Sequence, residues 1–339
     1  MKKLIVLLAL AVAVVALPSS AGSAPRKVRC TDKVNGARPL AIPVDGQTAT
    51  GQYTVPKTAA DTLVIFAHGY SHKSDSWVEH MKGAAAEHGV IAVTMDYRGT
   101  YTDKEGNIRG WFVKEGAADM IAATHLFQDA CSSIKETIIF GVSMGGNSSG
   151  LAVARAAEEE NSQGGPLFDY WFDIEGAVAV HETYAGASVL APANAFAANA
   201  KADIEAEMDG KTLEQDPAGY ADLAVVSHIE EIAASGVKGI VMVHALEDGL
   251  VPYNQSREFV PMLVANGIQT EMFTVAGKGK GESGTTITGY SGNTSSPFAG
   301  HASEASDTHI VMVTAFDRLW QLLNDDVAIS GKEVLVPGN

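Results

Sequence analysis

The chain has 339 residues, nearly half of them apolar, which is enough for one large α/β domain with an insertion and an ample core. Its formal net charge of −16 argues against the basic surface that nucleic-acid binding needs, and it suits a soluble protein. Neither an internal repeat nor a zinc-ligand spacing is present, and the sequence predicts no metal and no organic cofactor.

The first 24 residues resemble a secretory signal peptide. Two lysines precede an unbroken apolar run of 14 residues from Leu4 to Leu17, and a small, polar stretch with cleavage points after Ala21 or Ala24 follows. The run is too short to span a bilayer, so we expect no stable membrane anchor, although an uncleaved leader is the alternative. The sequence therefore predicts a secreted or periplasmic protein.

Two cysteines remain in the mature chain, Cys30 and Cys131. Disulfides persist in oxidising compartments, so export favours a bridge between them. Two unpaired, buried thiols are the alternative.

Apolar runs and helical periods alternate along the chain, and this order predicts a mostly parallel sheet with helices on both faces. The expected strands are Thr62–Phe66, Val90–Met95, Thr137–Phe140, Ala177–Val180, Gly239–Val243 and Gln269–Val275, after one or two edge strands within residues 30–60. The expected helices are Trp77–His88, Gly116–Ala130, 146–160, Glu258–Asn266 and His309–Leu323. Residues 184–235 are Ala-rich and acidic and predict a helical cap, and residues 277–300 predict a long loop.

The segment Gly141-Val142-Ser143-Met144-Gly145 lies between an expected strand and an expected helix. A G-x-S-x-G motif in this context is the signature of a nucleophile elbow, a sharp turn that exposes a serine hydroxyl above the sheet. Glycine on either side removes Cβ atoms that would collide with the turn. Ser143 is therefore the candidate nucleophile.

A serine hydroxyl needs a base to take its proton, and an imidazole base needs a carboxylate to orient it. Polar side chains gather at the expected carboxyl ends of the strands, where open α/β sheets bind ligands. Ser143, Asp248 and His301 follow in the chain order that this architecture uses. Glu247 and Glu182 are the alternative acids, and His309 is the alternative base.

Taken together, these motifs resemble the α/β-hydrolases across nearly all of the mature chain. His68-Gly69-Tyr70 resembles the oxyanion loop of that family, Glu247-Asp248-Gly249 its acid loop, and Gly300-His301 its histidine loop. The cap is somewhat like those of the prolyl-oligopeptidase and dienelactone-hydrolase branches. The resemblance implies an α/β-hydrolase fold with a helical cap inserted after the sixth strand, in which residues 25–183 and 236–339 form the core and residues 184–235 the cap.

The resemblance also implies the chemistry. We expect a secreted serine hydrolase that cleaves a small or polymeric carboxylic ester through an acyl-enzyme, with the backbone amides of Tyr70 and Met144 as the oxyanion hole. A prolyl-oligopeptidase-type peptidase and a non-catalytic binding protein on the same scaffold are the alternatives. The sequence does not specify the oligomeric state.

Overall fold

This computed structural model describes residues 27–276, 300–324 and 327–338. The predicted signal peptide and all of the predicted long loop except Gly300 lie outside the described residues. Among the described helices, none is both long enough and apolar enough to span a membrane.

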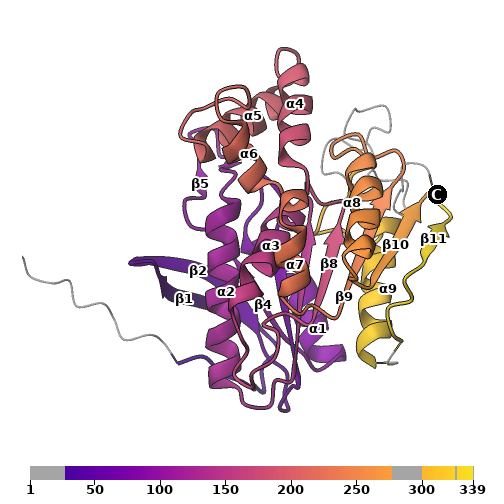
Figure 1. Cartoon of the computed structure of the whole chain (residues 1–339). Helices are drawn as coiled ribbons and strands as arrows, with labels where there is room; N and C mark the ends of the chain where they lie inside the picture. Colours follow the sequence, from indigo (N-terminus) through magenta and orange to yellow (C-terminus); the bar gives the residue numbers. More distant parts are fainter. Residues whose placement is uncertain (1–26, 277–299, 325–326, 339) are drawn as a thin grey trace, which may run out of the picture.

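A nine-stranded sheet runs through the described part of the chain, with the strand order β1-β2-β4-β3-β7-β8-β9-β10-β11 (Figure 1). Its strands are β1 (Arg38–Val44), β2 (Gln47–Thr54), β3 (Thr62–Ala67), β4 (Ile91–Met95), β7 (Glu136–Val142), β8 (Tyr170–Ile174), β9 (Gly239–Ala245), β10 (Thr270–Val275) and β11 (Glu333–Val336). β2 pairs antiparallel with β1 and with β4, and every other pair in this sheet is parallel. Two short strands, β5 (Tyr101–Thr102) and β6 (Ile108–Arg109), form a separate hairpin.

Helices cover both faces of the sheet because the central strands are apolar on both sides. Side chains of β3 alternate between two buried clusters: Leu63 and Ile65 belong to one, and Val64 and Phe66 to the other. The first cluster includes α2 (Val113–Ala130), α3 (Met144–Arg155) and α8 (Asn254–Ala265), and the second includes α1 (Val78–Glu87) and α9 (Ile310–Asn324). Short 3₁₀ turns, η1 (Ser74–Trp77) and η2 (Ala156–Glu158), adjoin α1 and α3.

Between β8, the sixth strand of the large sheet in chain order, and β9 the chain is helical. These helices are α4 (Val180–Leu190), α5 (Ala195–Glu207), α6 (Pro217–Leu223), the 3₁₀ turn η3 (Val225–Ser227) and α7 (Ile229–Ala234). In Figure 1, α4, α5 and α6 form the upper end of the molecule, beyond one edge of the strands. The division of the chain into a core and a cap domain at residues 184 and 235 stays a prediction.

One expected strand was wrong, and one strand was missed. The strand after α3 is Tyr170–Ile174, whereas Ala177–Val180 is a buried connection that leads into α4. Burial explains its apolar composition: it passes next to the elbow, where the amide of Ala177 donates to the carbonyl oxygen of Ser143 at 3.1 Å. β11, which pairs with β10, was not expected from the sequence.

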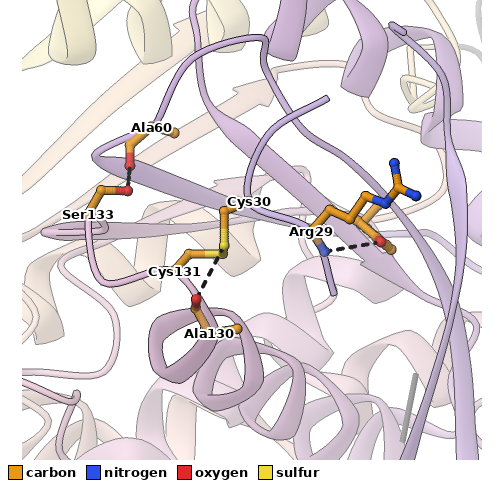
Figure 2. Close-up of a disulfide and its surroundings, with 7 residues drawn as sticks. Arg29, Cys30, Ala60, Ala130, Cys131 and Ser133 are labelled. Carbon is orange, nitrogen blue, oxygen red and sulfur yellow. Dashed lines mark hydrogen bonds between the residues drawn. A yellow bond between two sulfur atoms is a disulfide. The ribbon is translucent and has the colours of Figure 1, made fainter. Parts of the chain in front are cut away.

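The predicted disulfide is present. Cys30 precedes β1, Cys131 follows the last residue of α2, and their Cα atoms are 5.5 Å apart (Figure 2). The bridge joins positions separated by 101 residues and so attaches the N-terminal segment to the end of a core helix. Nearby, the Ser133 hydroxyl donates to the carbonyl oxygen of Ala60 at 2.5 Å.

Candidate active site

Ser143 lies at a sharp corner between β7 and α3. Its φ of +58° lies in a region that residues other than glycine rarely adopt. A strained backbone at the serine is typical of a nucleophile elbow. The two glycines of the motif are needed for close packing. A Cβ atom on Gly141 would lie 2.2 Å from the carbonyl oxygen of Gly145, and one on Gly145 would lie 2.2 Å from that of Ala67. The motif therefore contains glycine where the backbones of β3, β7 and α3 meet.

The structure brings the predicted acid and base together. Asp248 follows β9, and His301 lies in the segment before α9, 53 residues further along the chain. Nδ1 of His301 is 2.7 Å from Oδ2 of Asp248, a hydrogen-bond distance. Ser143 and His301 thus line one cavity, and Asp248 is hydrogen-bonded to His301 without lining it.

Asp248 is held as an anion. Its Oδ1 accepts from the amides of Leu250 and Val251, at 2.7 and 3.0 Å. Burial alone would raise the pKa of Asp248, but the charge of His301 and hydrogen bonds from His244 and His301 outweigh burial and lower it. A carboxylate that stays ionised can orient an imidazole and stabilise its charged form.

A second buried carboxyl group, Glu175, also lies beside the base. It directly follows β8, and its Oε2 is 3.5 Å from Nδ1 of His301. Its two oxygens accept from the amides of Ala302, at 2.5 Å, and Ala245, at 3.2 Å. Burial and the negative charge of Asp248 raise the pKa of Glu175 well above its usual value. The raised pKa favours the protonated form of Glu175, and its hydrogen bond to the amide of Ala302 holds the segment that carries the base.

Neither alternative acid occupies a comparable place. Glu247 is exposed, and Glu182 lies in the first turn of α4, not at the end of a strand. The prediction for Glu182 relied on the misplaced strand at Ala177–Val180. Glu175 was missed for the same reason, because it stands where the correctly placed strand ends.

The alternative base, His309, is buried just before α9. Its amide donates to the Ser306 hydroxyl at 3.0 Å, and its Nδ1 accepts from the amide of Val311 at 3.1 Å. These contacts are those of a residue at a helix start. His301, in contrast, lines the cavity with Ser143.

The candidate oxyanion residues flank the nucleophile. Met144 is the first residue of α3, so its amide is among those that have no acceptor within the helix. Tyr70 follows Gly69, and a Cβ atom on Gly69 would lie 3.4 Å from Cβ of Ser143. The Tyr70 hydroxyl donates to Oδ2 of Asp203 in α5 at 2.6 Å. This bond ties the loop that carries Tyr70 to the helices above the sheet.

Arg109, in the β5–β6 hairpin, also binds Asp203. Its Nε donates to Oδ2 of Asp203 and its Nη2 to Oδ1, both at 2.8 Å. Two parallel charge-assisted bonds of this kind fix orientation as well as distance. The loop, the hairpin and α5 are therefore held as one unit over the nucleophile.

An ion pair that the sequence did not predict lies on the cavity wall. Nδ1 of His72 is 2.8 Å from Oε1 of Glu304, and both residues line the cavity. Oε1 also accepts from the amide of Gly69, at 3.2 Å, and from the Ser76 hydroxyl, at 3.0 Å. Burial would raise the pKa of Glu304, but His72 outweighs it and lowers the pKa to about 2, while attraction to Glu304 raises the pKa of His72. Glu304 thus fixes the loop that ends at Tyr70.

The cavity above Ser143 has a volume of about 350 Å³. Its upper wall is formed by small and apolar side chains of α4 and α5, among them Ala187, Leu190, Phe196 and Ala200, and Trp111 lies at another side. An apolar cavity with a few converging polar groups is the usual form of a small-molecule site.

Among the described residues, Glu175, Asp248 and His301 are the one group with metal-ligand atoms close together, within 4.8 Å. The geometry is that of hydrogen bonding. The 2.7 Å between Nδ1 of His301 and Oδ2 of Asp248 is shorter than the separation of two ligands that each lie about 2.0–2.2 Å from one zinc ion.

Comparison with solved structures shows the fold. A Mycobacterium tuberculosis puromycin-hydrolyzing peptidase has a TM-score of 0.54 and 16% identity, over 89% of this chain and 42% of that one. The Pyrococcus horikoshii acylaminoacyl peptidase has a TM-score of 0.52 and 17% identity, over 70% of this chain and 37% of that one. A Pyrobaculum calidifontis esterase has a TM-score of 0.50 and 15% identity, over 71% and 75%.

These likenesses identify the α/β-hydrolase fold, as the sequence predicted. The chain spans well under half the length of the two peptidases. Comparisons with protein-family models and with curated protein sequences give no match.

Proposed function

We propose that this chain, which has the α/β-hydrolase fold, is a serine hydrolase that cleaves carboxylic esters. The proposal depends chiefly on one observation: His301 is hydrogen-bonded to the buried carboxylate of Asp248 and shares a cavity with Ser143 at the elbow. Ser256, His244 and Asp248 also lie within reach of one another, with His244 2.7 Å from Ser256 and 3.3 Å from Asp248, but Ser256 and His244 are buried and do not line the cavity.

The mechanism follows from the roles that these groups can take. His301 removes the proton as the Ser143 oxygen attacks the ester carbonyl, and Asp248 stabilises the imidazolium that forms. The backbone amides of Tyr70 and Met144 receive the negative charge on the carbonyl oxygen, and one such donor is worth on the order of 10²–10³ in rate. The imidazolium protonates the leaving alcohol. His301 then activates water, which releases the acid and restores the serine.

The cavity supports an ester with an apolar group as the substrate. Its upper wall is aliphatic and aromatic. Burial of a hydrocarbon chain against such a wall lowers the free energy by about 0.8 kcal/mol per CH₂ group. Whether the physiological ester is a small molecule or part of a polymer is a separate question, which a panel of graded substrates addresses.

The test compares p-nitrophenyl esters of two to twelve carbons with peptide p-nitroanilides, for the unaltered protein and Ser143→Ala. We expect ester turnover with an optimum at an intermediate chain length, and its loss by a factor of at least about 10³ in Ser143→Ala. Ester turnover that persists in the Ser143→Ala protein would contradict the mechanism. His309→Ala serves as a control for His301→Ala, which we expect to be inactive.

A serine peptidase is the second candidate. Two of the proteins with similar structures are peptidases, and amide and ester cleavage use the same triad chemistry. Anilide cleavage with a higher kcat/KM than that of any ester would favour this candidate. Failure to cleave either class and failure to react with a fluorophosphonate would indicate a binding protein.

Export is part of the proposal. The signal-like N-terminus predicts it, and the disulfide between Cys30 and Cys131 supports it because such bridges are rare in reducing compartments. Expression of the protein with and without residues 1–24, followed by fractionation of the cells, tests where the protein is located. A full-length product confined to the cytoplasm would contradict it.

A further inference from the structure

The geometry points to Glu182 as a charge-selecting residue: the cavity binds substrates whose apolar group ends in a cationic or neutral head, and it discriminates against anionic ones. This inference rests on the proposed function in one respect: it takes the cavity above Ser143 to be the place where the substrate binds. It concerns what the cavity accepts, not the reaction.

Glu182 contributes a carboxylate to an otherwise apolar part of the wall. It lies in the first turn of α4, on the helix that supplies Ala187 and Leu190 to the same cavity. Its Oε2 accepts a hydrogen bond from the side-chain amide of Asn254 at 3.1 Å. That donor is neutral, so it orients the carboxylate without cancelling its charge.

No cation neutralises Glu182 in the described part of the chain. Among these residues, no Lys, Arg or His nitrogen lies within 4.0 Å of its carboxylate, and no lysine or arginine belongs to the cavity lining. Two cations on elements next to the cavity have partners of their own: Arg109 in β6 pairs with Asp203, and Lys201 in α5 pairs with Glu205. An incoming cationic group can therefore pair with Glu182 without displacing a protein group.

The other charged groups on the wall cancel each other. Glu304 is paired with His72 at 2.8 Å, and both of the other groups that donate to Glu304, the Gly69 amide and the Ser76 hydroxyl, are neutral. His301 is matched by Asp248. Among the described lining residues, Glu182 is therefore the charged group without an oppositely charged partner.

The electrostatic field of the surrounding protein is also negative. Residues 184–235, which include α5 above the cavity, contain nine acidic side chains and two lysines, a formal net charge of −7, and the whole chain carries −16. A concave, low-dielectric site concentrates such a field, attracts cations and repels anions. An acyl chain that ends in a carboxylate would meet this field without a cationic partner.

The experiment uses three probes with the same six-carbon chain, namely hexylammonium, 1-hexanol and hexanoate. Their binding to the full mature chain is measured by calorimetric titration at pH 7 and low salt, for the unaltered protein, Glu182→Gln and Glu214→Gln. Gln keeps an acceptor for Asn254. Glu214 is an exposed residue in the same acidic segment, away from the cavity lining, and controls for the loss of one charge.

We expect hexylammonium to bind most tightly and hexanoate least tightly. In Glu182→Gln the ratio of hexylammonium to hexanol affinity should fall about three- to fivefold, as expected for a partly exposed ion pair, and in Glu214→Gln it should stay the same. Equal affinities for hexylammonium and hexanol in the unaltered protein would overturn the inference. An equal fall of both affinities in Glu182→Gln would also overturn it, because the residue would then shape the cavity and not select charge.

Turnover of p-nitrophenyl hexanoate is measured in parallel with the unaltered protein and Ser143→Ala. If the unaltered protein does not turn over the ester, or if turnover persists in Ser143→Ala, while the probes bind in the expected order, the ester-hydrolase proposal is rejected and the charge selection stands. The two failures are therefore distinguishable.

Discussion

Two carboxyl groups lie within 3.5 Å of the same imidazole nitrogen, but their pKa values are shifted in opposite directions. The pKa of Asp248 is lowered, which favours its ionised form, whereas that of Glu175 is raised, which favours its protonated form. Only an ionised group can stabilise the imidazolium that forms during the reaction. The two residues therefore differ in role although they are neighbours.

Isosteric substitution separates these roles. Asp248→Asn removes the charge and disturbs the tautomer of His301, and we expect kcat to fall on the order of 10⁴-fold. Glu175→Gln leaves the pair of His301 and Asp248 in place and loses about one hydrogen bond to the backbone, so the fall should be about tenfold or less. Ester turnover at saturating substrate is the measurement. A larger loss in Glu175→Gln than in Asp248→Asn would exchange the two assignments.

The ion pair between His72 and Glu304 makes stability depend on pH. Glu304 has a folded pKa of about 2, below its ordinary 4.5, so its contribution is present above pH 4.5 and is lost as the pH falls towards 2. The folded pKa of His72 is raised above 6.5, so its contribution is present below pH 6.5 and is lost as the pH rises through that raised value. The pair therefore stabilises the fold most between about pH 4.5 and 6.5.

His72→Gln keeps a hydrogen-bond donor for Glu304 and removes the charge. We expect the Tm difference between the two proteins to be largest near pH 5–6 and to shrink towards pH 9, with an effect on the order of 1 kcal/mol because His72 is partly exposed. A Tm difference that grows above pH 7 would contradict the pairing.

At the scale of the elements, the elbow depends on the close approach of β3, β7 and α3. A Cβ atom on Gly145 would lie 2.2 Å from the carbonyl oxygen of Ala67, which is backbone and cannot move aside cheaply. We expect Gly145→Ala to destabilise the fold by roughly 3 kcal/mol or more and to abolish ester turnover. Thermal unfolding and turnover are the measurements.

Gly83 in α1 provides the matched control. A Cβ atom there meets nothing within 4 Å, and the residue lies in a helix, where alanine is favoured by about 1 kcal/mol. Gly83→Ala should therefore keep or slightly raise the Tm. If both substitutions had the same effect, the steric account of the elbow would be wrong.

The sequence predicted the elements that have strong local signals and missed those that depend on distant contacts. Thr137–Phe140 and the G-x-S-x-G motif placed β7 and the elbow, because both signals are local. Tyr170–Ile174 was missed because its aspartate interrupts the apolar run, while the buried connection Ala177–Val180 imitates a strand. β11 is short and mostly exposed, so its pattern is weak.

Prediction of the site residues was limited in the same way. Ser143, Asp248 and His301 were found because each adjoins a recognisable strand end or motif. His72 and Glu304 lie 232 residues apart, and no local pattern reveals that they pair. Glu175 was hidden by the misplaced strand, and the signal that would have found it is its position directly after the aromatic-rich strand.

At the scale of the whole molecule, the disulfide between Cys30 and Cys131 closes a loop of about a hundred residues that contains β1 to β4 and α2. Such a bridge restricts the unfolded chain. We expect the Cys30→Ser, Cys131→Ser protein to lose about 2–5 kcal/mol in the free energy of unfolding, measured with denaturant. Its ester turnover at 25 °C should persist, because neither cysteine lines the cavity. An unchanged unfolding midpoint would contradict the account.

The central claim is that the fold makes the Ser143 hydroxyl nucleophilic. Reaction of the full mature chain with a fluorophosphonate, followed by peptide mapping with mass spectrometry, tests it most directly. The account predicts one adduct per chain, on Ser143, formed in proportion to the loss of ester turnover and abolished in His301→Ala. An unreactive protein, or an adduct on a different residue with Ser143 unmodified, would contradict it.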